Sequence, residues 1–142
     1  MIDVSLERIE RGFQMMQNWQ DRYRYLIQLG GKLDPMPEDL KIEEYRVKGC
    51  TSNVWLVSEP STDTPPHLHF RADSDAHIVK GLAALLLVMY SGRTAEEILQ
   101  VDARAVLERL GLQAHLSPSR SNGLFSMVER IRSEAVQSMA AG

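Results

Sequence analysis

The sequence is poor in cysteine, since Cys50 is the only one in 142 residues. A lone thiol cannot form an internal disulfide, so nothing points to an oxidising compartment. It also falls short of the four thiolates that an iron–sulfur cluster generally requires. A chain of this length can bury one sizeable core without disulfides. We therefore expect residues 1–142 to form a single domain.

Long apolar runs and an excess of basic residues are also missing. The longest apolar run, Leu82 to Tyr90, is far shorter than the roughly 20 residues that a membrane helix needs. The opening MIDVSLERIERGF lacks the basic-then-apolar pattern of a signal peptide. The formal net charge of −3 argues against a nucleic-acid-binding protein, because phosphate contacts require a basic face. These features predict a soluble, cytoplasmic protein that binds neither nucleic acid nor membrane.

The familiar catalytic and nucleotide-binding signatures are absent as well. The chain contains no G-x-S-x-G, Walker A or Rossmann glycine pattern. Gly81 stands alone in a helical pattern, where it favours close helix packing over phosphate binding. His67 and His69 share the parity of one strand face, a spacing that can bind zinc, but two histidines supply only half of a four-ligand site. We therefore predict no metal centre.

Helical periodicity dominates both ends of the chain. Asn18 is suited to cap a second helix in the first third, and Gly30-Gly31 ends that pattern. The apolar residues of this region recur at spacings of three, four and seven: Leu6, Ile9, Phe13, Met16, Tyr23, Leu26 and Ile27. The last half predicts further helices with these start signals: Asp73 to Asp75 before a helix from about Ala76 to Tyr90, a capping box at Thr94 to Glu97, Asp102, and Ser119 or Ser121.

The middle of the chain has the pattern of strands. Alternation at Tyr45–Lys48 and at His67–Arg71, and the apolar run Val54–Val57, predict three strands. Short connections favour an antiparallel meander over a parallel sheet, which needs long crossovers. The predicted fold class is α+β: a small three-stranded antiparallel sheet packed against N- and C-terminal helices.

Cys50 has an ordinary interpretation, because free cysteine is often a small buried hydrophobe. Its surroundings favour a reactive thiol instead. Gly49 permits a backbone turn, and Thr51, Ser52 and Asn53 are common in turns. Arg46 and Lys48 share the parity of Cys50, so an extended backbone would place both cations beside the thiol and favour the thiolate.

A lone thiol of this kind leaves several functions open from the residues alone. A cysteine-dependent hydrolase needs a histidine near Cys50 and a group that orients it. His77 and His115 are available, and Asp75 lies two residues from His77. A non-catalytic module in which Cys50 only packs is the other alternative.

Three stretches taken together resemble one family. They are RVKGCTSNVWL (46–56), DSDAHIVKGL (73–82) and LSPSRSNGL (116–124), and the N-terminal segment with Trp19, Asp21, Arg22 and Tyr23 extends the match. This combination resembles the SufE/CsdE family of sulfur acceptors for cysteine desulfurases. The order and spacing fit over nearly the whole chain. Ser117 stands where relatives often have threonine, a conservative difference.

The resemblance implies a function for Cys50. The thiol would accept a persulfide sulfur from a SufS- or CsdA-type cysteine desulfurase, stimulate that enzyme, and pass the sulfur on to a scaffold for iron–sulfur cluster assembly. The pyridoxal phosphate belongs to the desulfurase, so we expect no cofactor in this chain and no stand-alone enzyme. The implied fold is the one shared with IscU-type scaffolds, and a homodimer is compatible with it.

The resemblance also points to residues that support the thiol. Asp75 and Arg120 occupy motif positions and would shape the partner contact or the cysteine loop. Arg46, Lys48, Gly49 and Ser52 surround Cys50 in the sequence and complete the expected site. Because a persulfide in water is easily oxidised, we expect the loop to hold Cys50 against apolar neighbours at rest and to swing outward on docking.

Overall fold

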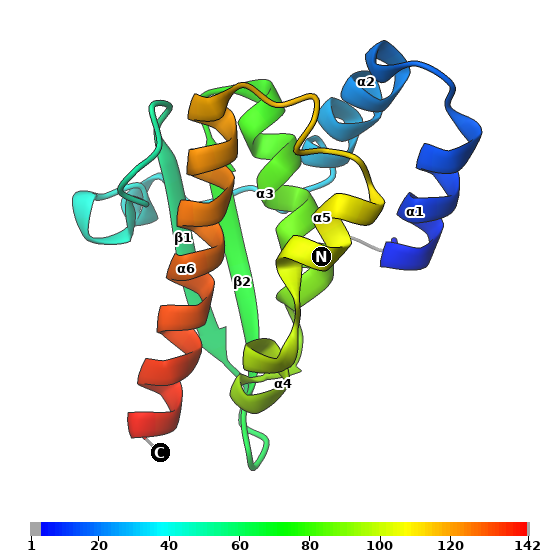
Figure 1. Cartoon of the computed structure of the whole chain (residues 1–142). Coiled ribbons are helices and arrows are strands. Elements are labelled where there is room, and N and C mark those ends of the chain that lie inside the picture. The colour runs from blue at the N-terminus through cyan, green and yellow to red at the C-terminus, as the bar shows by residue number, and fades with distance from the viewer. Residues whose placement is uncertain (1–3, 142) are drawn as a thin grey trace.

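The computed structural model describes residues 4–141 and shows helices packed around a small sheet (Figure 1). The two short 3₁₀ helices are labelled η. In chain order the elements are α1 (Leu6–Met15), α2 (Trp19–Gly30), η1 (Glu38–Leu40), η2 (Glu43–Tyr45), β1 (Val54–Pro60), β2 (His67–Ser74), α3 (His77–Tyr90), β3 (Arg93–Thr94), α4 (Ala95–Gln100), α5 (Ala103–Arg109) and α6 (Pro118–Ala141).

The sheet has the order β1-β2-β3, and both pairings are antiparallel. The predicted α+β class with a three-stranded antiparallel sheet is confirmed. The prediction of a strand at Tyr45–Lys48 is wrong, because only Arg46 forms a bridge, to Trp55. The Glu44 carbonyl just upstream accepts a hydrogen bond from the side chain of Arg130 instead of from a strand. The third strand is β3, whose two residues are too few to show any alternation.

Helix α3 forms the centre of the core. It packs against β2 on one side, α2 on another and α6 on a third, as Figure 1 shows. Ten of its residues are buried, including all of the apolar run from Leu82 to Tyr90 except Val88. A helix covered on several sides needs apolar residues around most of its circumference, which explains the run.

Gly81 lets α2 and α3 approach very closely. A Cβ atom at Gly81 would lie 2.2 Å from the Leu26 carbonyl oxygen, and one at Gly30 would lie 2.8 Å from the Gly81 nitrogen. Backbone atoms therefore occupy the space that a side chain would need. The prediction that Gly81 serves close packing is confirmed.

Several predicted helix starts match the structure. Asn18 accepts a hydrogen bond from the Asp21 N–H and caps α2, Thr94 and Glu97 form a capping box, and Asp102 caps α5. The start of α3 at His77 also agrees with the predicted position, but its predicted cap is wrong, and so is the predicted start of α6. Helix α3 has no side-chain cap, because the Asp75 carboxylate binds Asn53. Helix α6 begins at Pro118, since the Ser117 hydroxyl already accepts a hydrogen bond from the Arg120 N–H.

Within residues 4–141, none of the helices combines the length and the apolar character needed to span a bilayer.

Candidate functional site: a half-buried thiol packed on α6

Cys50 lies on a short connection that we call the cysteine loop, residues 48–52. Its upstream end is fixed by Val47, which is buried and donates its N–H to the Val54 carbonyl at 2.8 Å. Gly49 has a φ of +94°, a left-handed conformation that side chains disfavour. This turn sends the chain away from β1 and onto the surface of α6. The expectation that Gly49 makes a turn is confirmed.

The thiol of Cys50 is half-buried against α3 and α6. Its Sγ donates a weak hydrogen bond to the Gly123 carbonyl at 3.5 Å. Four apolar side chains of the two helices line the pocket that contains it: Val79, Leu82, Leu124 and Met127. The open space at this position is about 10 Å³, close to the smallest volume that holds one water molecule. The expectation that the resting loop holds Cys50 against apolar neighbours is confirmed.

Burial raises the pKa of the Cys50 thiol, and the Arg46 guanidinium lowers it by less. Removal from water destabilises the thiolate by more than the Arg46 guanidinium, which is already in a surface ion pair, stabilises it. Arg46 already donates two hydrogen bonds to the Glu43 carboxylate, at 2.9 and 3.0 Å. The hydrogen bond from Arg46 is the main cause that lowers the pKa of Glu43, and the exposed Lys48 adds the smallest contribution. Arg46 therefore favours the thiolate as predicted, while Lys48 makes no contribution to the shift, and burial outweighs Arg46 in the resting loop.

We expect Cys50 to react slowly at neutral pH in the free protein. Because the thiolate is the nucleophile, the rate of alkylation by iodoacetamide should rise with pH to a midpoint above the usual cysteine value of about 8.5. The urea-unfolded chain should titrate near 8.5. A midpoint below that of the unfolded chain would show that Arg46 outweighs burial.

The same shift makes a prediction for stability. The folded protein holds the thiol proton more tightly than the unfolded chain. Above the unfolded pKa the unfolded chain binds fewer protons, so stability should fall as the pH rises from about 8.5 towards the folded pKa. A Cys50→Ser variant should lack this part of the decline.

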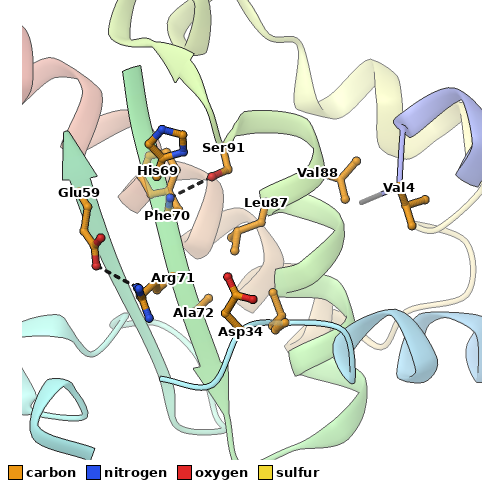
Figure 2. A pocket seen from close by; sticks show the side chains of 11 residues that line it. Val4, Asp34, Glu59, His69, Phe70, Arg71, Ala72, Leu87, Val88 and Ser91 are labelled. Atoms are coloured by element: carbon orange, nitrogen blue, oxygen red, sulfur yellow. Dashed lines mark hydrogen bonds and ion pairs between the residues drawn. The ribbon is translucent and has the colours of Figure 1, made fainter. Parts of the chain in front are cut away.

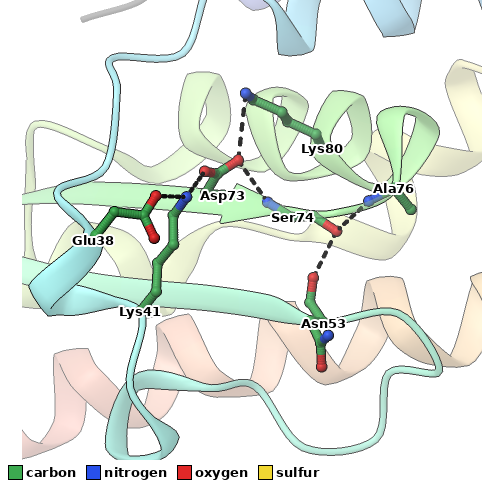
Figure 3. Close-up of polar contacts among 7 residues, drawn as sticks. All are labelled: Glu38, Lys41, Asn53, Asp73, Ser74, Ala76 and Lys80. Atoms are coloured by element: carbon green, nitrogen blue, oxygen red, sulfur yellow. Dashed lines mark hydrogen bonds and ion pairs between the residues drawn. The ribbon is translucent and has the colours of Figure 1, made fainter.

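Asp75 fixes the downstream end of the cysteine loop. Its carboxylate accepts from the Asn53 N–H at 3.1 Å and from Asn53 Nδ2 at 2.9 Å. The Ser74 hydroxyl donates to the Asn53 carbonyl at 2.7 Å (Figure 3). Asn53 is therefore held through its backbone and its side chain. Of the two roles that the resemblance implied for Asp75, these contacts fit that of shaping the cysteine loop.

A charged cluster braces the same end of the sheet. Lys41 bridges Glu38 and Asp73, at 2.8 and 3.0 Å, and Lys80 reaches Asp73 at 3.3 Å (Figure 3). Burial disfavours ionisation of Asp73, but hydrogen bonds from Lys41 and the Ser74 N–H, together with Lys80, lower its pKa overall. The chain on either side of the cysteine loop is thus tied to β2 and α3.

Arg120 lies at the start of α6 and lines the pocket of Cys50 together with Ser52. Its guanidinium sits over the Tyr23 ring, 5.8 Å from the centroid. Trp19 contacts Tyr23 edge-on and stacks on His115 at 4.4 Å. The N-terminal end of α2 therefore contributes aromatic side chains close to the cysteine loop.

The structure brings some expected residues together and separates others. Cys50, Ser52 and Arg120 line one pocket, and Asp75 holds the end of their loop. Arg46 and Lys48 line a different surface hollow with residues of η2 and α6. Sequence reasoning missed Asn53, Gly123 and Ser126 as parts of the site. Asn53 and Gly123 lie inside the stretches that carried the family resemblance, which was the available signal.

The hydrolase hypothesis lacks its histidine in this conformation. Within the described part of the chain, no histidine lines the Cys50 pocket or forms a hydrogen bond with its thiol. Of the two candidates, His77 is exposed as the first residue of α3, and His115 stacks on Trp19. Across residues 4–141, no three His, Cys, Asp or Glu side chains gather in a metal-binding arrangement.

A cavity of about 250 Å³ lies beside β2 and α3, on the part of β2 that extends past β3 (Figure 2). The Arg71–Glu59 ion pair and the hydrogen bond from the Phe70 N–H to Ser91 Oγ border it. None of the site residues expected from the sequence lines this cavity. It is therefore separate from the cysteine site.

Comparison with known proteins gives consistent results. A family model described as "SufE: Fe-S metabolism associated domain" matches residues 7–135. An uncharacterised SufE-like protein of Rhizobium meliloti (strain 1021) is 48% identical over 133 residues, 93% of this chain and 95% of that protein. One from Rhizobium etli is 48% identical over 139 residues, 97% of this chain and 94% of that protein.

A solved structure is also similar to this chain. The solution structure of a hypothetical protein from Thermus thermophilus aligns over 99% of both chains with a TM-score of 0.76. Its sequence identity is 20%, so this likeness bears on the fold alone.

Proposed function

The chain belongs to the SufE family of Fe–S metabolism, and on that basis we propose that Cys50 accepts sulfur from a cysteine desulfurase. The observation that carries the proposal is the position of the only thiol. Cys50 sits on a short loop with fixed ends, packed against apolar side chains and held by weak contacts. Such a loop shelters a sulfur at rest, and little free energy is needed to move it away from α6.

The chemistry is a thiol–disulfide-type exchange. The Cys50 thiolate attacks the outer sulfur of a persulfide on the desulfurase cysteine and forms a new S–S bond. The original S–S bond breaks, and its electron pair leaves with the desulfurase thiolate. Cys50 then carries the persulfide, and no electrons are gained or lost overall. The step requires a thiolate and an accessible sulfur, but no metal.

Outward movement of the loop would change the thiol chemically. Burial among Leu82, Leu124 and their neighbours is what raises the pKa of Cys50. When the loop leaves this pocket on docking, the desolvation is lost and the influence of Arg46 remains. The proposal therefore couples exposure of Cys50 to formation of its nucleophilic form.

The partners follow from the same proposal. The donor is a SufS- or CsdA-type desulfurase, which supplies its own pyridoxal phosphate, and the acceptor is a scaffold that builds iron–sulfur clusters. Arg120, Tyr23 and Trp19 lie near the loop and form a surface that the desulfurase would contact. We place the reaction in the cytoplasm, where thiols stay reduced.

The direct test is to mix the protein with a desulfurase and cysteine, and to locate the sulfur by mass spectrometry. We expect a mass increase of one sulfur atom on the peptide that contains Cys50, and its removal by a reducing agent. Faster alanine release by the desulfurase should accompany it. If an active SufS-type desulfurase and an active CsdA-type desulfurase both fail to give the adduct, the proposal is excluded.

Gly49→Ala is expected to loosen the cysteine loop. The variant places a Cβ in the left-handed region and 2.4 Å from Ser126 Oγ, so the serine must rotate away. We expect a loss of about 1–2 kcal/mol in the free energy of unfolding and faster alkylation of Cys50. Urea denaturation and iodoacetamide kinetics measure the two effects.

A second pair of variants separates the causes. Ser126→Ala alone should change stability and alkylation rate little. Gly49→Ala/Ser126→Ala should recover only the part of the lost stability that comes from the clash between the new Cβ and Ser126. If Gly49→Ala matched the wild-type protein in both measurements, the backbone conformation would not be what holds the loop on α6.

A further inference from the structure

One face of α6 lies along the chain that carries Cys50. Ser119 contacts Thr51, Gly123 contacts Cys50, Ser126 faces Gly49, and Arg130 binds the carbonyls of Arg46 and Glu44. The α6 residues are spaced by four, three and four, which puts them on one side of a helix. Residues 44–51 therefore run antiparallel to α6.

These contacts differ greatly in strength. Thr51 and Ser119 pair through exposed hydroxyls at 3.2 Å, and the thiol of Cys50 is a weak donor at 3.5 Å. Gly49 meets Ser126 only by close packing. Arg130 at the far end makes a charge-assisted bond to the Glu44 carbonyl at 3.1 Å, a kind roughly twice as strong as a neutral one, and a longer bond to the Arg46 carbonyl at 3.4 Å. The end of the chain near Ser119 therefore releases most easily.

Arg130 is itself held in place. Its side chain is 24% exposed, and Nε pairs with the Glu134 carboxylate at 3.0 Å. Ser58 of β1 donates to the other oxygen of Glu134 at 3.1 Å. The two terminal nitrogens of Arg130 reach the Glu44 carbonyl at 3.1 Å and the Arg46 carbonyl at 3.4 Å. The arginine thus joins β1, α6 and the chain just upstream of the cysteine loop.

We infer that Arg130 is a positioning residue for sulfur transfer and forms the pivot about which the cysteine loop leaves α6. The inference rests on the proposed function of Cys50. Attack on a persulfide needs the thiolate aligned with the S–S bond, and small misplacements cost large factors in rate. A fixed pivot upstream, with Asp75 holding Asn53 downstream, limits the orientations that the released loop adopts.

The test combines two reactions of the same thiol in Arg130→Ala. Iodoacetamide is small and reacts from any direction, so its rate with Cys50 should rise about tenfold when the loop is released more often. Sulfur transfer needs alignment, so maximal stimulation of a desulfurase should fall about tenfold, with half-saturation changed less than about twofold. Both rates for Arg130→Lys should lie between those of the wild type and Arg130→Ala, because the lysine ammonium keeps the charge but does not span both carbonyls.

Arg132→Ala is the matched control. Arg132 is also a half-buried arginine of α6, and it donates to the Leu99 carbonyl at 3.2 Å, away from the cysteine loop. We expect wild-type values in both reactions. Unchanged rates for Arg130→Ala would overturn the inference. So would a rise in both reactions, since exposure alone would then limit transfer, or an equal loss in Arg132→Ala.

The outcomes separate this inference from the proposed function. If wild-type protein gains no sulfur from the desulfurase, the function itself fails. If wild-type protein gains sulfur and Arg130→Ala behaves identically to it, only the role of Arg130 fails.

Discussion

Cys50→Ser is expected to accept no sulfur and to leave the desulfurase at its unstimulated rate. Serine fits the same pocket, so the fold should persist, but its hydroxyl is not a nucleophile at neutral pH without a neighbouring base. The structure provides no histidine at this position among the described residues. Mass spectrometry of the mixed proteins and the rate of alanine release measure the two losses. Full activity in Cys50→Ser would exclude Cys50 as the acceptor.

The double variant Cys50→Ser/Ser52→Cys is a sharper control. Ser52 lines the same pocket and lies on the same loop, so the variant restores one thiol to the loop two positions away. We expect it to remain inactive, because the turn at Gly49 directs the side chain of residue 50, and not that of residue 52, to the Gly123 carbonyl. Recovery of transfer would show that any thiol on the loop is sufficient.

Gly81→Ala is expected to cause the largest loss of stability. Its Cβ would lie 2.2 Å from the oxygen and 2.7 Å from the carbon of the Leu26 carbonyl, and backbone atoms cannot rotate away as a side chain can. Helices α2 and α3 must move apart, which we expect to cost about 3 kcal/mol. For a domain of this size the midpoint of thermal unfolding should fall by about 10 °C. Calorimetry or urea denaturation measures the change.

Gly12→Ala is the control for Gly81→Ala. It makes the same exchange inside α1, where the nearest foreign atom to the new Cβ is a side-chain carbon of Tyr25 at 3.9 Å. Alanine is the better helix former by about 1 kcal/mol, so this variant should be as stable as the wild type or more so. If both variants lost stability equally, the α2–α3 contact would not be the cause.

The Gly81 variant also has a consequence for the site. Leu82 follows Gly81 and, with Val79, forms the α3 wall of the Cys50 pocket. A displaced α3 would widen that pocket and lower the pKa of the thiol towards its ordinary value. Faster alkylation of Cys50 at neutral pH should therefore accompany the loss of stability.

The sequence predicted the local features of the molecule well. Asn18, Thr94 and Asp102 cap the helices expected of them, because a cap depends on residues only three positions apart. The strand cores of β1 and β2 followed from the apolar run Val54–Val57 and from the alternation at His67–Arg71. The strand expected at Tyr45–Lys48 failed because Tyr45 ends the 3₁₀ helix η2 and Gly49 turns the chain away from β1, so only Arg46 forms a bridge.

By itself the sequence determined the α+β class and identified one thiol on a turn after Gly49 as the reactive candidate. Only the tertiary structure decided the state of that thiol. Val79 and Leu82 of α3 and Leu124 and Met127 of α6 bury Cys50 from distant parts of the chain and raise its pKa. Burial comes from packing between such segments, and local patterns encode only near neighbours. Arg46 lowers the pKa of the thiol, as its position in the sequence predicted, but burial by these distant segments raises it by more.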